Sequence, residues 1–281
     1  MDKTAQSPWL HRYALLVAAA ALILIGSGAF VTSSREASAA PDVSAPQTLA
    51  GAAVHQGLGI GVVALALVLA VWLWLAHRRA WPRILGTIGF ALVGSDAWLP
   101  ALSPGQAAHH ASFASLFFGC VAGVVFLTSP DWKLAPEVVD DRGMHFLRPL
   151  AISAPPLVLL QIVLGALYRH KVTSVMWHMA GAMIVSLVTL IACMVVIQQY
   201  PSYRPLKGSA VHLMSIVLLQ VTLGVTAFTM QLLETENTVA LAVITGSHVV
   251  VGNLTLAASL LFAVQVHRNV RLAAAAKAAT P

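Results

Sequence analysis

The sequence predicts an all-α polytopic membrane protein, with eight transmembrane helices in two similar four-helix bundles. Three observations predict it: the composition, the recurrence of long apolar runs and the distribution of positive charge. Of 281 residues, 58% are hydrophobic and only 9% are charged, and the mean hydropathy is +0.82. Soluble domains carry about 25% charged residues, so this chain lacks the polar surface that water requires and must be solvated by lipid.

Eight apolar runs are long enough to cross a bilayer. A spanning helix needs about 20 apolar residues at a rise of about 1.5 Å per residue. The third run is the weakest, because it is short and Asp96, Trp98 and Pro100 crowd its end. The predicted spans are 13–32, 52–76, 83–100, 107–128, 149–169, 174–197, 210–230 and 239–265.

The positive charges predict the direction of the helices. An even number of spans places both termini on one side, and that side collects thirteen of the sixteen lysines and arginines, while the other has only Arg35, Arg169 and Lys171. Cytoplasmic loops of membrane proteins are enriched in Lys and Arg. We therefore expect a multi-pass protein of the inner (plasma) membrane with both termini in the cytoplasm. The net charge of +6 reports this orientation, and we expect no nucleic-acid partner.

The longest inner loop divides the chain into two halves. We expect an N-terminal four-helix half over 1–130, a cytoplasmic linker over 131–148 and a C-terminal four-helix half over 149–281. A weak internal repeat supports the division: Leu-Leu-Gln-Ile-Val-Leu-Gly at 159–165 recurs as Leu-Leu-Gln-Val-Thr-Leu-Gly at 218–224. Each copy lies on an odd-numbered helix and precedes a histidine on the next helix.

The candidate chemistry lies in the histidines. Histidines at the inner helix ends and loops are expected to face water or headgroups; these are His11, His77, His145 and His267. Five others lie inside the even-numbered helices, one to three turns from their outer ends: His55, His109, His110, His178 and His248. An ionisable group inside a membrane is costly unless it is paired, so these five are functional candidates.

Haem iron is the metal that suits these imidazoles best. Zinc and copper sites usually include a carboxylate or thiolate, or bring three ligands to one point, whereas haem takes axial imidazoles from facing helices. The residue four positions after each histidine shares its helix face and is small, which would let a porphyrin lie against the helix: Gly59, Ala114, Ala182 and Gly252. The alternative reading is an interhelical hydrogen bond at each histidine. His109 and His110 point about 100° apart, and helix geometry leaves open which one is the ligand.

The chain resembles the haem A synthase family over nearly its whole length. The resemblance rests on Gly-Ser-Gly-Ala-Phe-Val-Thr at 26–32, on the two Gln-x-x-x-Gly motifs at 161–165 and 220–224, on Gly-Ala-Leu-Tyr-Arg-His at 165–170, and on the placement of the histidines. By position, the ligands of the family fall on His55 and His110 in the first half and on His178 and His248 in the second.

The resemblance implies a reaction and its cofactors. Family members oxidise the C8 methyl group of haem O to a formyl group, giving haem A during cytochrome oxidase assembly. The first half would hold the substrate haem and the second half a haem b that passes electrons. Arg169 and Lys171 would suit haem propionates, with ordinary helix-end charge as the alternative. Haem O synthase and terminal oxidase subunits would be partners, within membrane lipid.

The chain also departs from the family pattern. Ala52 occupies the position of a family Glu, three residues before the first histidine, while Gln56 and Met179 replace the Arg that follows the first histidine of each half. An outer-loop cysteine pair of many bacterial members is absent, since Cys120 and Cys193 lie within apolar runs. Loss of the carboxylate removes a candidate proton acceptor. The alternative function is therefore a dihaem b-type cytochrome without synthase activity, and the third is a haem-free membrane protein such as a transporter.

Overall fold

The computed structural model describes residues 8–38, 45–96, 103–134, 136, 138–233 and 238–271. Over these residues the chain is almost entirely helical, which confirms the predicted all-α membrane fold. The eight α-helices are α1 (Pro8–Ser38), α2 (Ala45–Ala76), α3 (Ala80–Asp96), α4 (Pro104–Thr128), α5 (Leu147–Arg169), α6 (Val175–Gln199), α7 (Arg204–Leu232) and α8 (Thr238–Asn269). A short 3-10 helix, η1 (Pro130–Lys133), follows α4.

Seven of the described helices are long and apolar enough to cross a membrane, and α3 is the exception. It has 17 residues, which is less than the length of a usual span. The predicted third span ran to residue 100, but 97–100 lie outside the described residues. The helix that the sequence marked as weakest is therefore also the shortest in the structure.

Helix ends differ from the predicted ones where polar residues continue or cap the helix. Helix α4 begins at Pro104, three residues before the predicted start at 107. Ser103 is its N-cap: the Ser103 hydroxyl accepts a hydrogen bond from the Gln106 amide, and the Gln106 side chain accepts one from the Ser103 amide. This reciprocal capping box satisfies two backbone donors that would otherwise lack partners.

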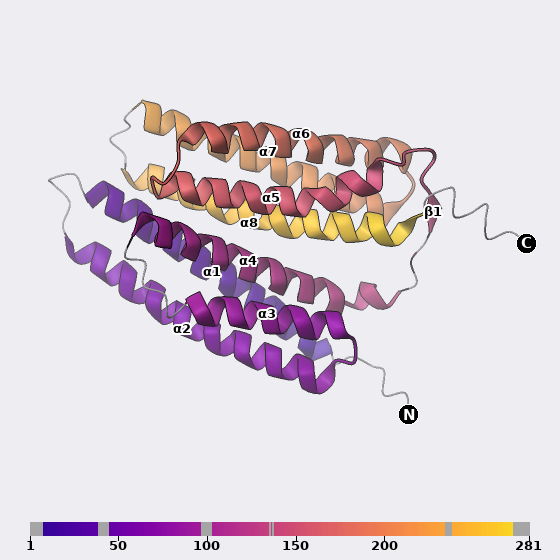
Figure 1. Cartoon of the computed structure of the whole chain (residues 1–281), viewed down its shortest axis with the longest axis horizontal. Coiled ribbons are helices and arrows are strands. Elements are labelled where there is room, and N and C mark those ends of the chain that lie inside the picture. The colour runs from indigo at the N-terminus through magenta and orange to yellow at the C-terminus, as the bar shows by residue number, and fades with distance from the viewer. Residues whose placement is uncertain are drawn as a thin grey trace, which may run out of the picture.

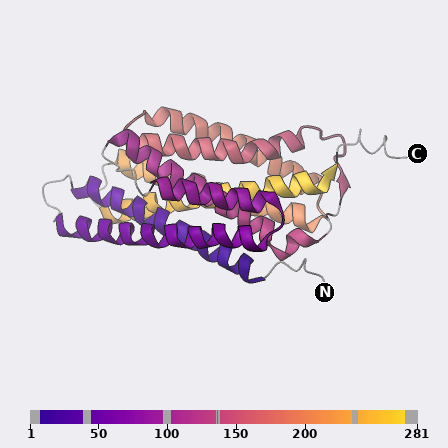
Figure 2. The same cartoon turned by 60° about the horizontal axis from the view of Figure 1, so that its bottom comes forward.

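The helices form two rings of four, each closed on itself. Within the first ring α1 contacts α2 and α4, and α3 contacts α2 and α4; α5 to α8 repeat this order in the second ring. The rings meet through α1 against α8 and α4 against both α5 and α8, and Figure 1 shows α5 and α8 lying along α1 and α4. Figure 2 turns α2 and α3 toward the viewer, on the side of the first ring away from α6.

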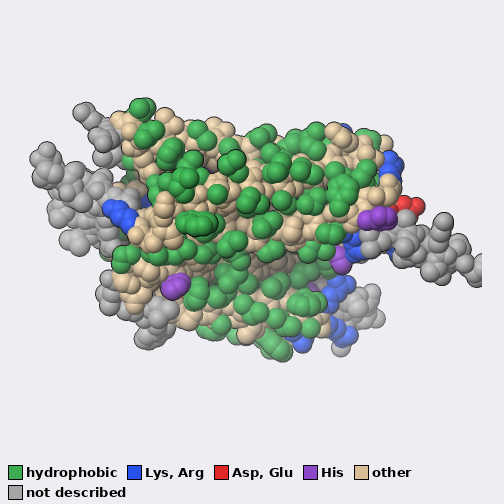
Figure 3. Space-filling model, turned by 45° about the horizontal axis from the view of Figure 1, so that its top comes forward, with side chains coloured by type: hydrophobic (Ala, Val, Ile, Leu, Met, Phe, Trp, Pro, Cys, Tyr) green, Lys and Arg blue, Asp and Glu red, His purple; other side chains and the backbone are tan. Residues whose placement is uncertain are grey.

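Each ring has its own core. Leu10, Leu73 and Phe117 are fully buried in the first, and Leu206, Leu213 and Phe262 in the second. Leu, Ile and Met side chains cover the outside, as expected for a surface that meets lipid. Figure 3 shows this apolar side surface, with Lys and Arg side chains gathered mainly at one end.

That charged end holds the start of α1 and the end of α8 (Figure 1). Here the linker forms a short strand, β1 (Val139–Asp140), which pairs in parallel with β2 (Val270–Arg271) directly after α8. The Tyr200 hydroxyl, at the end of α6, donates a hydrogen bond to the Asp140 carbonyl. These contacts tie the linker to the second ring.

One histidine at this end does not face water. His77, between α2 and α3, is 0% exposed, and its Nδ1 accepts a hydrogen bond from the Arg79 amide. The sequence pattern could not anticipate this, because the turn between the two helices folds His77 inward while Arg78 and Arg79 stay outside. Burial lowers the pKa of His77, and the charges of Arg79 and Arg83 lower it further.

The burial of His77 predicts a loss of stability in mild acid. Because its pKa in the folded state lies below the ordinary value of 6.5, the unfolded chain binds the proton more tightly, and folding stability falls as the pH drops below that value. We expect the unfolding midpoint in detergent to fall between pH 7 and pH 5, and His77→Asn, which keeps the acceptor without the titration, to reduce this fall. The exposed His212→Asn is the control. An unchanged pH profile in His77→Asn would show that other groups cause the acid sensitivity.

Candidate functional site

The four histidines singled out by position form two pairs, one in each ring. The imidazole centroids of His55 and His110 are 6.0 Å apart, with ring planes at 75°. Those of His178 and His248 are 6.2 Å apart, at 85°. Because α2 and α4 lie diagonally across the first ring, and α6 and α8 across the second, each pair meets inside its own ring.

The structure separates the two adjacent histidines of α4. His109 is exposed, whereas His110 turns toward His55 and is partly buried. Helix geometry alone left the choice between them open. The packing of α4 in the ring settles which of the two faces the partner histidine.

Three of the imidazoles rest on a glycine of the preceding odd-numbered helix. A Cβ atom built on Gly28 of α1 would lie 2.9 Å from Cε1 of His55. The same construction gives 2.9 Å from Gly165 of α5 to His178 and 2.8 Å from Gly224 of α7 to His248. Real Cβ contacts are longer than this, so any side chain at these positions would displace the ring.

Two of these glycines occupy matching places in the sequence repeat. Gly165 and Gly224 close the two Gln-x-x-x-Gly motifs, and Gly28 belongs to the motif at 26–32. The sequence indicated the motifs, but it gave no sign that each glycine is a seat for a histidine. The signal present in the sequence is that each glycine lies on the helix directly before one that carries a histidine. The fourth histidine, His110, lies against α3 and has a different partner.

That partner is Asp96, at the end of α3. Its Oδ2 lies 2.9 Å from Nδ1 of His110, and the carboxylate is 7% exposed. The sequence analysis noted Asp96 only as a residue that weakens the third span. The signal was present, because Asp96 is the only acidic residue inside any of the eight predicted spans, and such residues mark functional sites.

Hydrogen bonds fix the tautomer of His55 in the first pair. The Ser27 hydroxyl donates its single proton to the Leu24 carbonyl at 2.8 Å, so its contact of 2.8 Å with His55 Nδ1 requires that Nδ1–H donates to Ser27. Asp96 Oδ2 lies 2.9 Å from His110 Nδ1 as a charge contact, and its geometry is not that of a hydrogen bond. A neutral His55 therefore carries its lone pair on Nε2, which is the arrangement of a metal-binding histidine held by an outer partner.

The second pair is held by the two glutamines of the repeat. His248 Nδ1 donates to the backbone carbonyl of Gln220 at 3.1 Å, and the Gln220 amide lies 3.3 Å from His248 Nε2. Gln161 donates from Nε2 to the His178 carbonyl at 2.7 Å and lies 2.9 Å from His178 Nδ1. His178 thus accepts at Nδ1. To bind a metal through Nε2, it needs Gln161 to present Oε1, which is buried without a hydrogen-bond partner among the described residues.

The small residues four positions after the histidines have mixed surroundings. A Cβ on Gly252 would lie 3.1 Å from Nε2 of Gln220, so this glycine makes room for the glutamine. A Cβ on Gly59 would meet only Leu24, at 3.9 Å. In the second ring Gly181, next to the expected Ala182, accommodates the side chain of Gln161.

The two cationic candidates, at the end of the rings opposite the start of α1, differ in their surroundings. Arg169 reaches from α5 across to α1, where it donates to the Ala29 carbonyl at 2.7 Å and to the Ser33 hydroxyl at 2.5 Å. Lys171 is exposed just beyond α5, with a φ of 59°. His170 lies between these two residues in the sequence. Burial lowers its pKa, and the charges of Arg169 and His110 lower it further. Arg169 therefore joins the two rings close to both histidine pairs.

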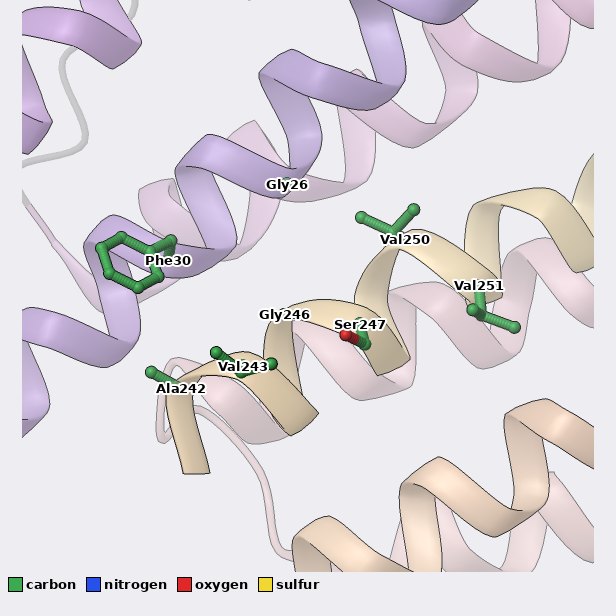
Figure 4. Close-up of a pocket in the computed structure, with 8 residues that line it drawn as sticks. All are labelled: Gly26, Phe30, Ala242, Val243, Gly246, Ser247, Val250 and Val251. Atoms are coloured by element: carbon green, nitrogen blue, oxygen red, sulfur yellow. The ribbon is translucent and has the colours of Figure 1, made fainter. Parts of the chain in front are cut away.

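An apolar pocket of about 330 Å³ lies between α1 and α8, where the rings meet. Figure 4 shows Gly26 and Phe30 of α1 on one side and Ala242, Val243, Gly246, Ser247, Val250 and Val251 of α8 on the other. Gly26 precedes the Ser27 that holds His55, and Ser247 precedes His248. None of the four histidines lines the pocket itself.

The centroid separation within each pair fits two imidazole ligands of one haem iron. Metal–imidazole bonds of about 2 Å, with roughly 1 Å from nitrogen to ring centre, place two opposed imidazoles with centroids about 6 Å apart. The observed separations are 6.0 and 6.2 Å. In the described part of the chain, no three His, Cys, Asp or Glu side chains converge on one point, and each ring brings two imidazoles together.

The close packing of glycines against the imidazoles predicts the behaviour of a matched set of variants. Gly165→Ala and Gly224→Ala each place a Cβ under 3 Å from an imidazole and should lower the haem retained per protein after purification, measured by Soret absorbance. Gly61→Ala on α2, where a Cβ meets nothing within 4 Å, should retain the full amount. Equal retention in all three variants would contradict a role for these glycines in holding the imidazoles.

Comparison with known proteins gives no further assignment. No protein family model matches the sequence, and no curated protein matches it.

Proposed function

We propose that this is a membrane haem protein with two bis-imidazole sites, one in each ring, that transfers electrons between them. The observation that supports it is the equal spacing of the two pairs, His55 with His110 and His178 with His248. Two unrelated hydrogen-bonding histidines would have no reason to repeat the same separation and near-perpendicular planes in both halves. The repeated glycine seats point the same way.

The residues of the chain divide the work at each site. The bound haem b would supply a reversible one-electron change at its iron. Ser27, Asp96 and the Gln220 carbonyl hold the imidazoles by Nδ1, which fixes ring orientation and ligand basicity. The surrounding apolar helices exclude water.

The positive-inside distribution supports an inner-membrane location with both termini in the cytoplasm. Thirteen of sixteen Lys and Arg residues belong to the side that carries the termini. In that orientation both histidine pairs lie toward the outer face of the membrane, and Arg169 and Lys171 lie at the outer surface, where haem propionates would meet them.

A second candidate is the haem A synthase-type reaction, with haem O as substrate of the first ring and haem A as product. One observation favours it: the first pair contains a buried carboxylate, Asp96, whose Oδ1 has no hydrogen-bond partner among the described residues. The family Glu is Ala52 here, and Asp96 is the carboxylate that could accept a proton in its place. Haem O synthase and terminal oxidase subunits would then be the partners.

The first test is the pigment. Protein purified after haem-replete expression should show a reduced-minus-oxidised spectrum of two b-type haems per chain. His110→Ala should remove one haem and His248→Ala the other, since each deletes an axial ligand in one ring. A colourless protein, or one that keeps both haems in these variants, would refute the proposed sites.

The second test separates the enzyme from the cytochrome. Cells that also produce haem O should yield haem A in acid extracts if the chain is a synthase, and Asp96→Asn should abolish that product while Asp140→Asn, at the opposite end, leaves it unchanged. Two haem b per chain with no haem A would exclude synthase activity and leave the electron-transfer function.

A further inference from the structure

The two histidine pairs differ in the charge of the groups that hold them. Among the residues that the structure describes, Asp96 is the only carboxylate in ion-pair contact with any of the four imidazoles. It is 6% exposed as a residue. A buried charge of this kind acts strongly on its neighbour because little water screens it.

The second pair has only neutral hydrogen-bond partners. His248 donates to a backbone carbonyl, and His178 contacts the side-chain amide of Gln161. The Arg169 guanidinium acts through space on His248. Among the described residues, the first pair therefore has a carboxylate in contact with it and the second pair has none.

We propose that Asp96 gives the first-ring haem a lower reduction potential than the second-ring haem, so that an electron entering the protein comes to rest in the C-terminal half. This inference rests on the proposed haem sites. A carboxylate beside the Nδ1 atom of a metal-binding imidazole, as Asp96 lies beside His110, makes that ligand more basic. A more basic ligand stabilises ferric over ferrous iron, which lowers the potential.

A purely structural role for Asp96 makes a different prediction. Its contact with His110 links the end of α3 to the start of α4, and this link could simply hold the two helices together. In that case removal of the charge would change haem content or thermal stability but not the potential of the haem that remains. The potential is therefore the measurement that separates the two roles.

The experiment is a redox titration of the full-length protein, followed in the visible haem bands. The wild type should titrate in two steps. Single-haem variants assign them: the lower step should be lost in His110→Ala and the higher step in His248→Ala. If the first-ring haem has the higher potential, or if both haems have the same potential, the inference is wrong.

Substitutions at Asp96 then test the cause. Asp96→Asn should shift only the lower step to a more positive potential, Asp96→Glu should restore most of the difference, and the distant Asp140→Asn should change neither. If Asp96→Asn retains both haems with unchanged potentials, Asp96 is structural and the inference fails. If Asp96→Asn loses the first haem, the order of the two steps in the wild type decides. Protein without haem would instead overturn the proposed function, and this inference with it.

Discussion

The high cost of a polar ring in lipid is the constraint on which this structure depends. An imidazole in the hydrocarbon layer needs polar partners for its nitrogen atoms and closely packed atoms against its faces. The chain satisfies this with two rings of helices whose even members face each other diagonally, so that each histidine points inward. The odd members provide the rest, with a glycine against the imidazole in three cases and a hydrogen-bond partner at Nδ1 in three. At the fourth, the Asp96 carboxylate lies beside Nδ1 of His110.

Much of this could be predicted from the sequence, because the physics that decides it is local. The lengths of the apolar runs predicted the helices. The distribution of Lys and Arg predicted how the helices are oriented in the membrane. The histidines stood out because each is a polar residue at similar depth in an even helix. The family resemblance predicted the pairing of His55 with His110 and of His178 with His248. The structure brings the two imidazoles of each pair together.

The contacts that depend on packing between distant segments were not accessible. Asp96 looked like the end of a weak span, since nothing in a linear pattern shows that α3 presents it to α4. Helix geometry left open the choice between His109 and His110, and only the resemblance pointed to His110; the rotation of α4 in its ring turns His110 toward His55. Gly252 was predicted to leave room for a porphyrin. In the structure the Gln220 side chain of α7 lies beside this glycine, a contact that the linear pattern does not show. His77 looked exposed because its neighbours are charged, yet a tight turn buries it.

The histidine pairs of the two halves have similar geometry, but among the described residues only the first pair has a carboxylate beside it. This difference gives the proposed electron transfer a direction. We propose that each ring holds one haem between two imidazoles whose planes are nearly perpendicular. Electron paramagnetic resonance of the oxidised, purified protein tests it most directly. The account predicts two low-spin ferric signals of the strongly anisotropic kind produced by perpendicular axial imidazoles, with one lost in each of His110→Ala and His248→Ala. A high-spin signal from five-coordinate iron, or the absence of a haem signal, would contradict it.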